Sequence, residues 1–259
     1  MSARCSFAWL ACAAAVALGA HVAPARADDA TTDVDVSRIT LKLRGGGWNV
    51  SDKLPYGAAV DSSPLTVGGE RRVITAGRQH SRDGLVMLVS ATRGERGIST
   101  HAECEPQDGV YVRKFNRGQS NYIPLQCLRV EGPANFPADP TVFGEDFAAV
   151  ATSRHVAMPP DGYVVTVVVS NDNGASVEIL ALIGSHFTGL PDKSAAAPLP
   201  DGMPSAVAAW ADQLAEEALG TLSSWSGRMT VPPVAFRSPS PPPPAARNTA
   251  LAASAAIKD

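Results

Sequence analysis

The stretch GYVVTVVVSNDNGASVEILALIG, residues 162–184, decides the fold. Two runs rich in Val, Ile and Leu flank the polar segment 171–174, which ends in Asn-Gly. Because β-branched residues favour strands and Asn and Gly tolerate positive φ, this pattern predicts a hairpin of two antiparallel strands. Apart from Thr166, the first run is apolar on both faces, so we expect it at the centre of a sheet. A calcium loop at 171–174 is disfavoured because the spaced acidic ligands and the later Glu are missing.

The same kind of pattern extends over most of the chain on the N-terminal side of this hairpin. Short runs rich in Val, Ile and Thr are separated by Gly, Pro and Asn, which is typical of an all-β sandwich or barrel. In the run at residues 36–43, Ile39, Leu41 and Leu43 alternate with polar residues and predict a strand with one buried face. We therefore expect a mainly β protein, an antiparallel β-sandwich over residues 28–190. The expected strands are 36–43, 71–78, 84–92, 97–104, 109–115, 122–130, 162–170 and 175–183.

Two segments favour helix. Residues 145–153 carry apolar side chains at helical spacing and predict a short helix inside the β domain. Residues 191–203 read as a Pro/Ala linker, and residues 204–222 predict a C-terminal amphipathic helix that packs on the β domain. In the alternative, Trp210 and Leu214 of its apolar stripe bind a partner protein. That stripe consists of Val207, Trp210, Ala211, Leu214 and Ala218. The side expected to face solvent consists of Asp212, Gln213, Glu216 and Glu217.

The remaining C-terminal residues, 223–259, are rich in Pro, Ser and Ala. Such a segment buries too little apolar area to offset its ordering entropy, so we expect a disordered Pro/Ala-rich tail. Its run of four prolines favours an extended spacer.

The first residues, 1–27, have the anatomy of a secretory signal peptide. Arg4 precedes an uncharged apolar run, and Ala25-Arg26-Ala27 forms a small-x-small cleavage site. An uncleaved anchor is the alternative, but the apolar run is shorter than the roughly 20 residues of a spanning helix. We expect a periplasmic or secreted protein with no transmembrane segment after cleavage. Its formal net charge of -3, made more negative by the loss of two arginines, disfavours nucleic acid as a partner.

The segment HAEC, residues 101–104, raises the question of a metal site. A His-x-Glu with nearby cysteines occurs in zinc deaminases, but their second half needs two cysteines and here only Cys127 follows. Signal removal takes away Cys5 and Cys12 and leaves one pair in an exported chain, which favours a disulfide between Cys104 and Cys127. We predict that disulfide, and no metal site or cofactor.

No catalytic residues are predicted, because the chain shows no nucleophile elbow, no phosphate loop and no paired acid and base. Trp48, beside the glycine-rich loop 45–47, and Tyr56 are possible ligand-binding aromatics that could stack on a sugar ring. The alternative is that Trp48 packs back on the core.

We expect an exported non-catalytic binding or structural module of a bacterial-type cell envelope that acts through protein contacts. Its partner would be another envelope protein or an envelope polymer. The first alternative is a carbohydrate-binding module that uses Trp48 and Tyr56. The second is an exported hydrolase with a dispersed site, which would bring His155 or His186 together with an acid and a Ser.

Overall fold

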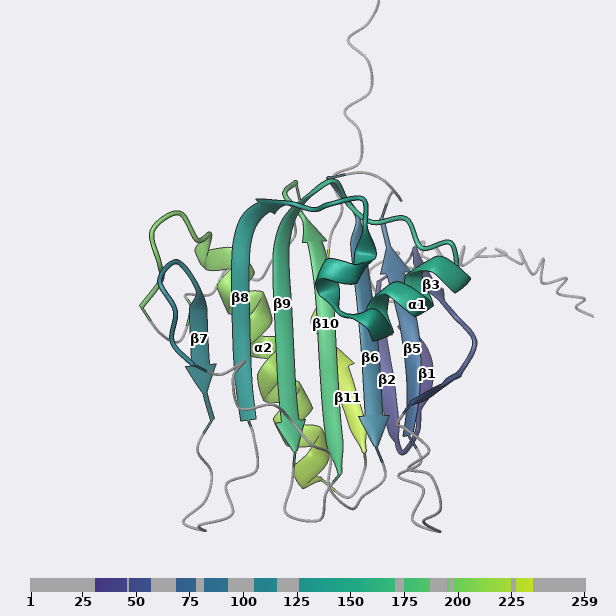
Figure 1. Cartoon of the computed structure of the whole chain (residues 1–259). Helices are drawn as coiled ribbons and strands as arrows, with labels where there is room; N and C mark the ends of the chain where they lie inside the picture. The colour runs from purple at the N-terminus through teal and green to yellow at the C-terminus, as the bar shows by residue number, and fades with distance from the viewer. Residues whose placement is uncertain are drawn as a thin grey trace, which may run out of the picture.

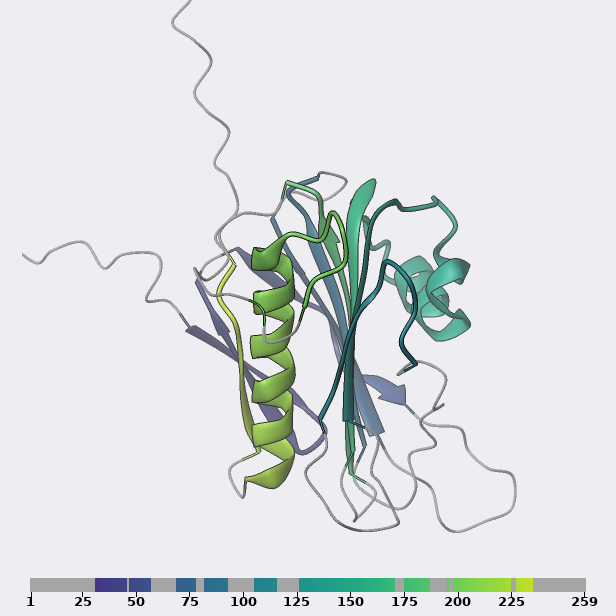
Figure 2. The same cartoon turned by 90° about the vertical axis from the view of Figure 1, so that its left-hand side faces the viewer.

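The computed structural model is built around one large antiparallel sheet (Figure 1). A small sheet and the long helix α2 cover one face of it, and the short helix α1 lies on the other face (Figure 2). The mainly β, antiparallel sandwich with a C-terminal helix is therefore confirmed. The structure describes residues 31–45, 47–56, 69–77, 82–92, 105–115, 126–170, 175–186, 195, 198–224 and 227–234.

The large sheet has the strand order β3-β5-β6-β10-β9-β8-β7, with β4 also paired to β5. The predicted hairpin is confirmed, since β9 and β10 pair in register from Ser170 opposite Ser176, and β8 flanks β9 on its other side. The turn at 171–174 and the strand expected at 97–104 lie outside the described residues. The strands are β3 (Trp48–Val50), β4 (Leu54–Tyr56), β5 (Gly69–Ala76), β6 (Leu85–Thr92), β7 (Tyr111–Lys114), β8 (Gln126–Asn135), β9 (Asp161–Ser170) and β10 (Ser176–Gly184).

The small sheet consists of β1 (Thr31–Val36), β2 (Ile39–Arg44) and β11 (Arg228–Val231). The prediction of one strand over 36–43 is wrong at its start, because Ser37 has a φ of 55° and turns the chain between β1 and β2. The predicted inward face of β2 is confirmed, with Ile39, Leu41 and Leu43 buried.

β11 corrects the expected tail. Residues 227–234 are not disordered: β11 pairs in parallel with β2, and both Met229 and Val231 are fully buried. The expected linker at 191–203 also packs on the core, through Leu199 and Met203. Residues 235–259 lie outside the described residues.

The main core is enclosed by the large sheet, the small sheet and α2 (Ser205–Ser223). Trp210 and Leu214 have no exposed surface, and the indole Nε1–H of Trp210 donates to the carbonyl oxygen of Pro232 at 3.3 Å. The helix therefore closes its own domain, as we expected. The alternative in which these two side chains bind a partner is wrong.

Asp212 is a second correction on this helix. We expected it on the solvent side, but its side chain is buried against β7. Its carboxylate accepts hydrogen bonds from the Tyr111 hydroxyl at 2.9 and 3.0 Å and from Arg113 at 3.3 Å. Arg113 also donates to Glu216 at 2.6 Å. A buried carboxylate needs such partners, and these bonds join α2 to the edge strand of the large sheet.

The other face of the large sheet carries a smaller core. The 3-10 helix η3 (Pro140–Phe143) and α1 (Glu145–Ser153) lie on it, and the bounds expected for the short helix are confirmed. Phe147, Val150 and Ala151 of α1 pack on Val86 and Leu182 of the sheet. These two short helices cover only part of the face, and the rest of it shapes the site described next.

Candidate binding groove

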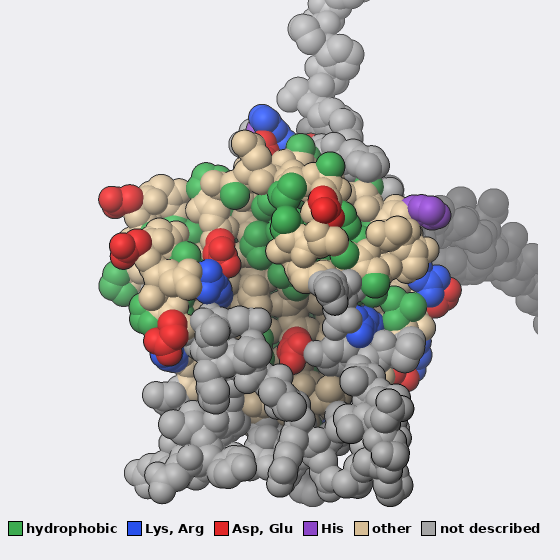
Figure 3. Space-filling view, in the orientation of Figure 1, with side chains coloured by type: hydrophobic (Ala, Val, Ile, Leu, Met, Phe, Trp, Pro, Cys, Tyr) green, Lys and Arg blue, Asp and Glu red, His purple; other side chains and the backbone are tan. Residues whose placement is uncertain are grey.

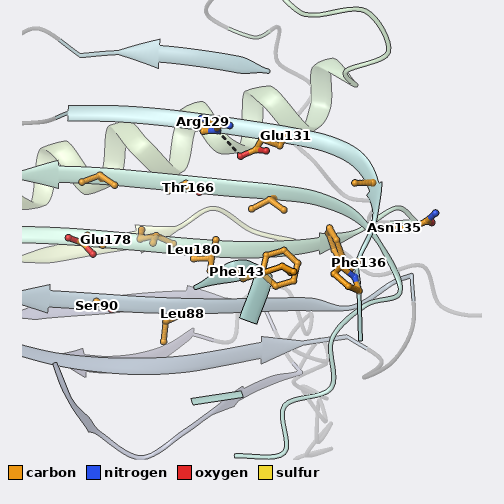
Figure 4. A pocket seen from close by; sticks show the side chains of 16 residues that line it. Leu88, Ser90, Arg129, Glu131, Asn135, Phe136, Phe143, Thr166, Glu178 and Leu180 are labelled. Carbon is orange, nitrogen blue, oxygen red and sulfur yellow. Dashed lines mark hydrogen bonds and ion pairs between the residues drawn. The ribbon is translucent and has the colours of Figure 1, made fainter. Parts of the chain in front are cut away.

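A groove with a volume of about 630 Å³ lies on the α1 face of the large sheet. Its floor is formed by β6, β10, β9 and β8, and its wall by the segment from Asn135 to Phe143 (Figure 4). Strands lie about 4.8 Å apart, so the floor is about 14 Å wide across these four strands. Along β9 it reaches from Val164 to Val168, about 13 Å at the usual rise per residue. This volume is within the range of ligand pockets in proteins.

The register of the strands explains why these residues meet. Glu178 pairs with Ser90 on one side and with Val168 on the other, and directly paired residues of antiparallel strands share a face. In the same way Thr166 shares its face with Arg129. Side chains from four strands that are far apart in sequence thus form one surface.

One end of the groove is aromatic. Phe143 makes edge-to-face contacts with Phe136 at 5.6 Å and with Phe147 at 5.7 Å between ring centroids. Val142, next to Phe143, is 60% exposed. In the space-filling view of this face, hydrophobic side chains gather where η3 and α1 lie (Figure 3). Edge-to-face packing fixes the rings, so this end presents a rigid apolar wall.

A bulge in β8 brings Phe136 to that end. The pairing of β8 with β9 shifts between Glu131 and Ala134, and a bulge of this kind bends a strand. Gly132, inside the bulge, has a φ of 117°, and a Cβ atom there would lie 2.6 Å from the carbonyl oxygen of Gly162. Only glycine fits this close approach of two backbones. The sequence Gly-Pro at 132–133 thus carries the chain over the sheet toward η3.

The first turn of η3 is held by Asp139. Its carboxylate accepts a hydrogen bond from the backbone N–H of Thr141 at 2.9 Å. This backbone hydrogen bond favours the ionised form and lowers the pKa of Asp139. The cap fixes the start of the helix that carries Phe143.

The rest of the groove is polar and charged. Arg129 donates from Nε to Oε1 of Glu131 at 2.6 Å and from Nη2 to Oε1 of Gln107 at 2.8 Å. Glu178 and Ser90 lie at the end of the groove away from Phe136 (Figure 4). Among the described residues that line the groove are two carboxylates, Glu131 and Glu178, and one guanidinium, Arg129.

Trp48 and Tyr56 are not brought together. The backbone of Trp48 pairs with Ala76 and that of Tyr56 with Gly69, at opposite ends of β5 and about 23 Å apart at the usual rise per residue. Their backbone positions are therefore too far apart to form one platform for a single sugar ring. Trp48 is partly buried against the main core, and its Nε1–H donates to the carbonyl oxygen of Arg44 at 2.9 Å.

Cys127 is buried in β8 and is disulfide-bonded. A cysteine in a disulfide supplies no thiolate to a metal, which removes one of the three ligands that a zinc site would need. Cys104 and His101 lie outside the described residues, so the pairing of Cys104 with Cys127 stays a prediction. Within the described ranges, no three His, Cys, Asp or Glu side chains are arranged to hold a metal ion.

The two histidines of the hydrolase alternative are exposed, and neither lines the groove. Beside His186, the Ser185 hydroxyl is hydrogen-bonded to Asp161, which also forms an ion pair with Arg82 at 2.8 Å. Asp161 therefore joins the ends of β9 and β10.

The sequence did not single out the residues of the groove. Its one available signal was that Thr166 and Glu178 interrupt the two most apolar runs of the chain.

Comparison of this chain with protein-family models, with curated proteins and with solved structures found no match. In the part of the chain that the structure describes, no helix combines the length and the apolar character needed to span a bilayer.

Proposed function

We propose that this chain is an exported, non-catalytic binding module of a bacterial-type cell envelope, which acts through protein contacts and holds its partner in the groove. The groove itself carries this proposal. It combines a rigid apolar wall with a few polar groups, which is the usual composition of a binding site in a protein.

The position of the groove supports a binding role. The middle of its floor belongs to the central strands β9 and β10, which are paired on both sides and packed on the main core. Side chains on such strands are held more rigidly than side chains on loops, so less conformational entropy is lost on binding. The export expected from residues 1–27 places the partner in the envelope or outside the cell.

The test is to block the groove without unfolding the protein. Thr166 lies on the floor and is partly exposed, so Thr166→Trp fills the groove from below. Thr75→Trp is the matched control, because Thr75 is a partly exposed residue of the same sheet that does not line the groove. Both variants are first compared with the wild type in thermal unfolding.

The tagged mature protein is then crosslinked in cells that naturally make it and is purified with its partner. We expect the partner to be captured by the wild type and by Thr75→Trp and to be lost with Thr166→Trp. If Thr166→Trp folds and still captures the same partner as the control, the groove is not the binding surface and the proposal fails.

A further inference from the structure

We infer that the outer edge of β1 receives an extended segment of another protein, which continues the small sheet by one strand. That segment carries no acidic residue where it lies opposite Asp33 and Asp35. The edge is separate from the groove, because the small sheet and α1 lie on opposite faces of the large sheet (Figure 2). The inference therefore goes beyond the proposed function and does not depend on it.

The direction of the backbone groups of β1 follows from its pairing with β2. Asp35 lies opposite Thr40, and the N–H of Thr40 donates to the carbonyl oxygen of Gly227, on the other side of β2, at 2.8 Å. Asp35 and Thr40 are therefore not hydrogen-bonded to each other, and in antiparallel strands such pairs recur at every second residue. The backbone N–H and C=O groups of Thr31, Asp33 and Asp35 consequently point away from β2.

Most of this outer edge of β1 is open. The carbonyl oxygen of Asp35 accepts a hydrogen bond from Nε of Arg72 at 3.1 Å. Among the residues that the structure describes, no other hydrogen bond reaches the outward backbone groups of Thr31, Asp33 or Asp35. The first three residues of β1 are also exposed. An exposed strand edge with open N–H and C=O groups is a template for pairing with another chain.

The opposite edge of the small sheet is closed by side chains of α2. The carboxylate of Glu217 accepts a hydrogen bond from the backbone N–H of Thr230 at 3.2 Å. The Thr221 hydroxyl donates to the carbonyl oxygen of Arg228 at 2.9 Å. These bonds occupy groups of β11 with which a further strand would have to pair. Covering an edge in this way prevents association there, so the contrast singles out β1 as the edge where a partner strand pairs.

The side chains of β1 argue against a second copy of this chain as the occupant. In a twofold antiparallel pair of β1 strands, the two registers that use most of the strand place Asp33 opposite Asp33 or opposite Asp35. Like charges directly opposite each other destabilise a sheet. A segment of another protein avoids this repulsion if it has no acid at these positions. It need not supply a cation, because Lys42 already lies opposite Asp33 on β2.

The experiment follows amide hydrogen exchange of the isotope-labelled mature protein by nuclear magnetic resonance while a peptide is added. The first probe is Thr-Lys-Val-Lys-Val-Lys-Thr with blocked ends, in which Lys lies opposite Asp33 and Asp35. The N–H of Asp33 should exchange rapidly in the free protein. It should exchange about tenfold more slowly when about nine-tenths of the protein is bound, because exchange then proceeds from the remaining tenth. A matched peptide with Glu in place of each Lys should bind more weakly.

Methylation of the peptide nitrogens tests whether the two backbones pair. In an antiparallel partner, the residues opposite Asp33 and Asp35 direct their N–H groups to β1, and these are the Lys residues. N-methylation of the Lys residues should therefore abolish the protection of Asp33, whereas N-methylation of the Val residues should leave it. A parallel partner would reverse the two results. The same effect of both modifications would contradict strand pairing.

Two variants of one residue separate its backbone from its side chain. Asp33→Pro removes the outward N–H but no hydrogen bond between β1 and β2, and proline is tolerated in edge strands. This variant should lose the peptide, read as unchanged exchange of the N–H of Asp35. Asp33→Asn keeps the N–H and should bind the peptide at least as tightly as the wild type. Thermal unfolding of both variants checks that they are folded.

Three results overturn the inference. In the first, the N–H of Asp33 exchanges slowly in the free protein, so that the edge is already occupied by another part of the chain or by a second copy. In the second, millimolar peptide gives no protection of Asp33. In the third, the Glu peptide protects as well as the Lys peptide. None of these results bears on the groove, which Thr166→Trp tests separately.

Discussion

Replacing Trp210 by Ala tests how the C-terminal helix belongs to the fold. The indole has no exposed surface and packs between the large sheet and the small sheet, so the substitution opens a cavity that neighbouring side chains fill only in part. Truncation of a buried Trp costs about 3–5 kcal/mol in the free energy of unfolding. The carbonyl oxygen of Pro232 also loses its donor, which places the expected cost in the upper part of that range.

Urea unfolding of the oxidised mature protein, followed by far-ultraviolet circular dichroism, measures this cost without relying on tryptophan fluorescence. With a slope of about 2 kcal/mol per molar urea, a loss of about 4 kcal/mol lowers the midpoint by about 2 M. Trp48→Ala is the matched control, since Trp48 is partly exposed at the edge of the same core and should shift the midpoint by less than half as much.

Two outcomes would refute this account of the helix. In the first, the midpoint of Trp210→Ala stays within about 0.3 M of the wild type at an unchanged slope, which is the range of ordinary surface substitutions. In the second, Trp210→Ala and Trp48→Ala shift the midpoint equally. The first result would mean that α2 contributes little to the stability of the β domain. The second would mean that the full burial of Trp210 adds no more stability than the partial burial of Trp48.

Three further predictions concern covalent and backbone features. Protein recovered from the exported fraction should contain Cys104 and Cys127 as one disulfide, so that reduction raises its intact mass by two hydrogens; two free thiols in the native protein would contradict the pairing. Deleting residues 237–259 should leave the urea midpoint unchanged. Deleting residues 228–259 removes β11 with two fully buried side chains and should lower the free energy of unfolding by about 3–6 kcal/mol. Equal midpoints for the two truncations would contradict the role of β11. Gly162→Ala should prevent stable folding, because its Cβ atom would lie 1.8 Å from the carbonyl oxygen of Ile183, and a variant that melts like the wild type would show that the strands can separate there.

The sequence predicted those elements whose signals are local. Alternating or continuous apolar runs placed the strands β5, β6, β9 and β10 within a few residues, and helical spacing placed both α1 and α2. In each case the spacing of the apolar residues along the sequence follows the period of the helix or strand that buries them. The hairpin at 162–184 was the strongest such signal, since two apolar runs and a turn sequence agreed.

The features that escaped the sequence depend on partners far away in the chain. β11 has only four residues, and its strand character comes from pairing with β2 near the other terminus. The tail prediction judged it by composition alone and was wrong there. Asp212 belongs to the polar side of its helix, but the edge strand β7 reaches that side and buries it with Tyr111 and Arg113. Neither the strand β11 nor the burial of Asp212 can be predicted from the neighbouring residues in the sequence alone.

Part of the groove could have been located from the same hairpin that decided the fold, because two polar residues interrupt its apolar strands. Thr166 stands among valines in β9, and Glu178 stands between Val177 and Ile179 in β10, where apolar residues on both faces would pack better against a second layer. A Glu on a central strand is costly unless its side chain meets water, a counter-charge or a polar ligand. Both residues point to the α1 face, on the part of it that lines the groove and not on the part that α1 packs against. The polar interruptions of these two strands therefore mark where the second layer of the fold ends and the groove begins.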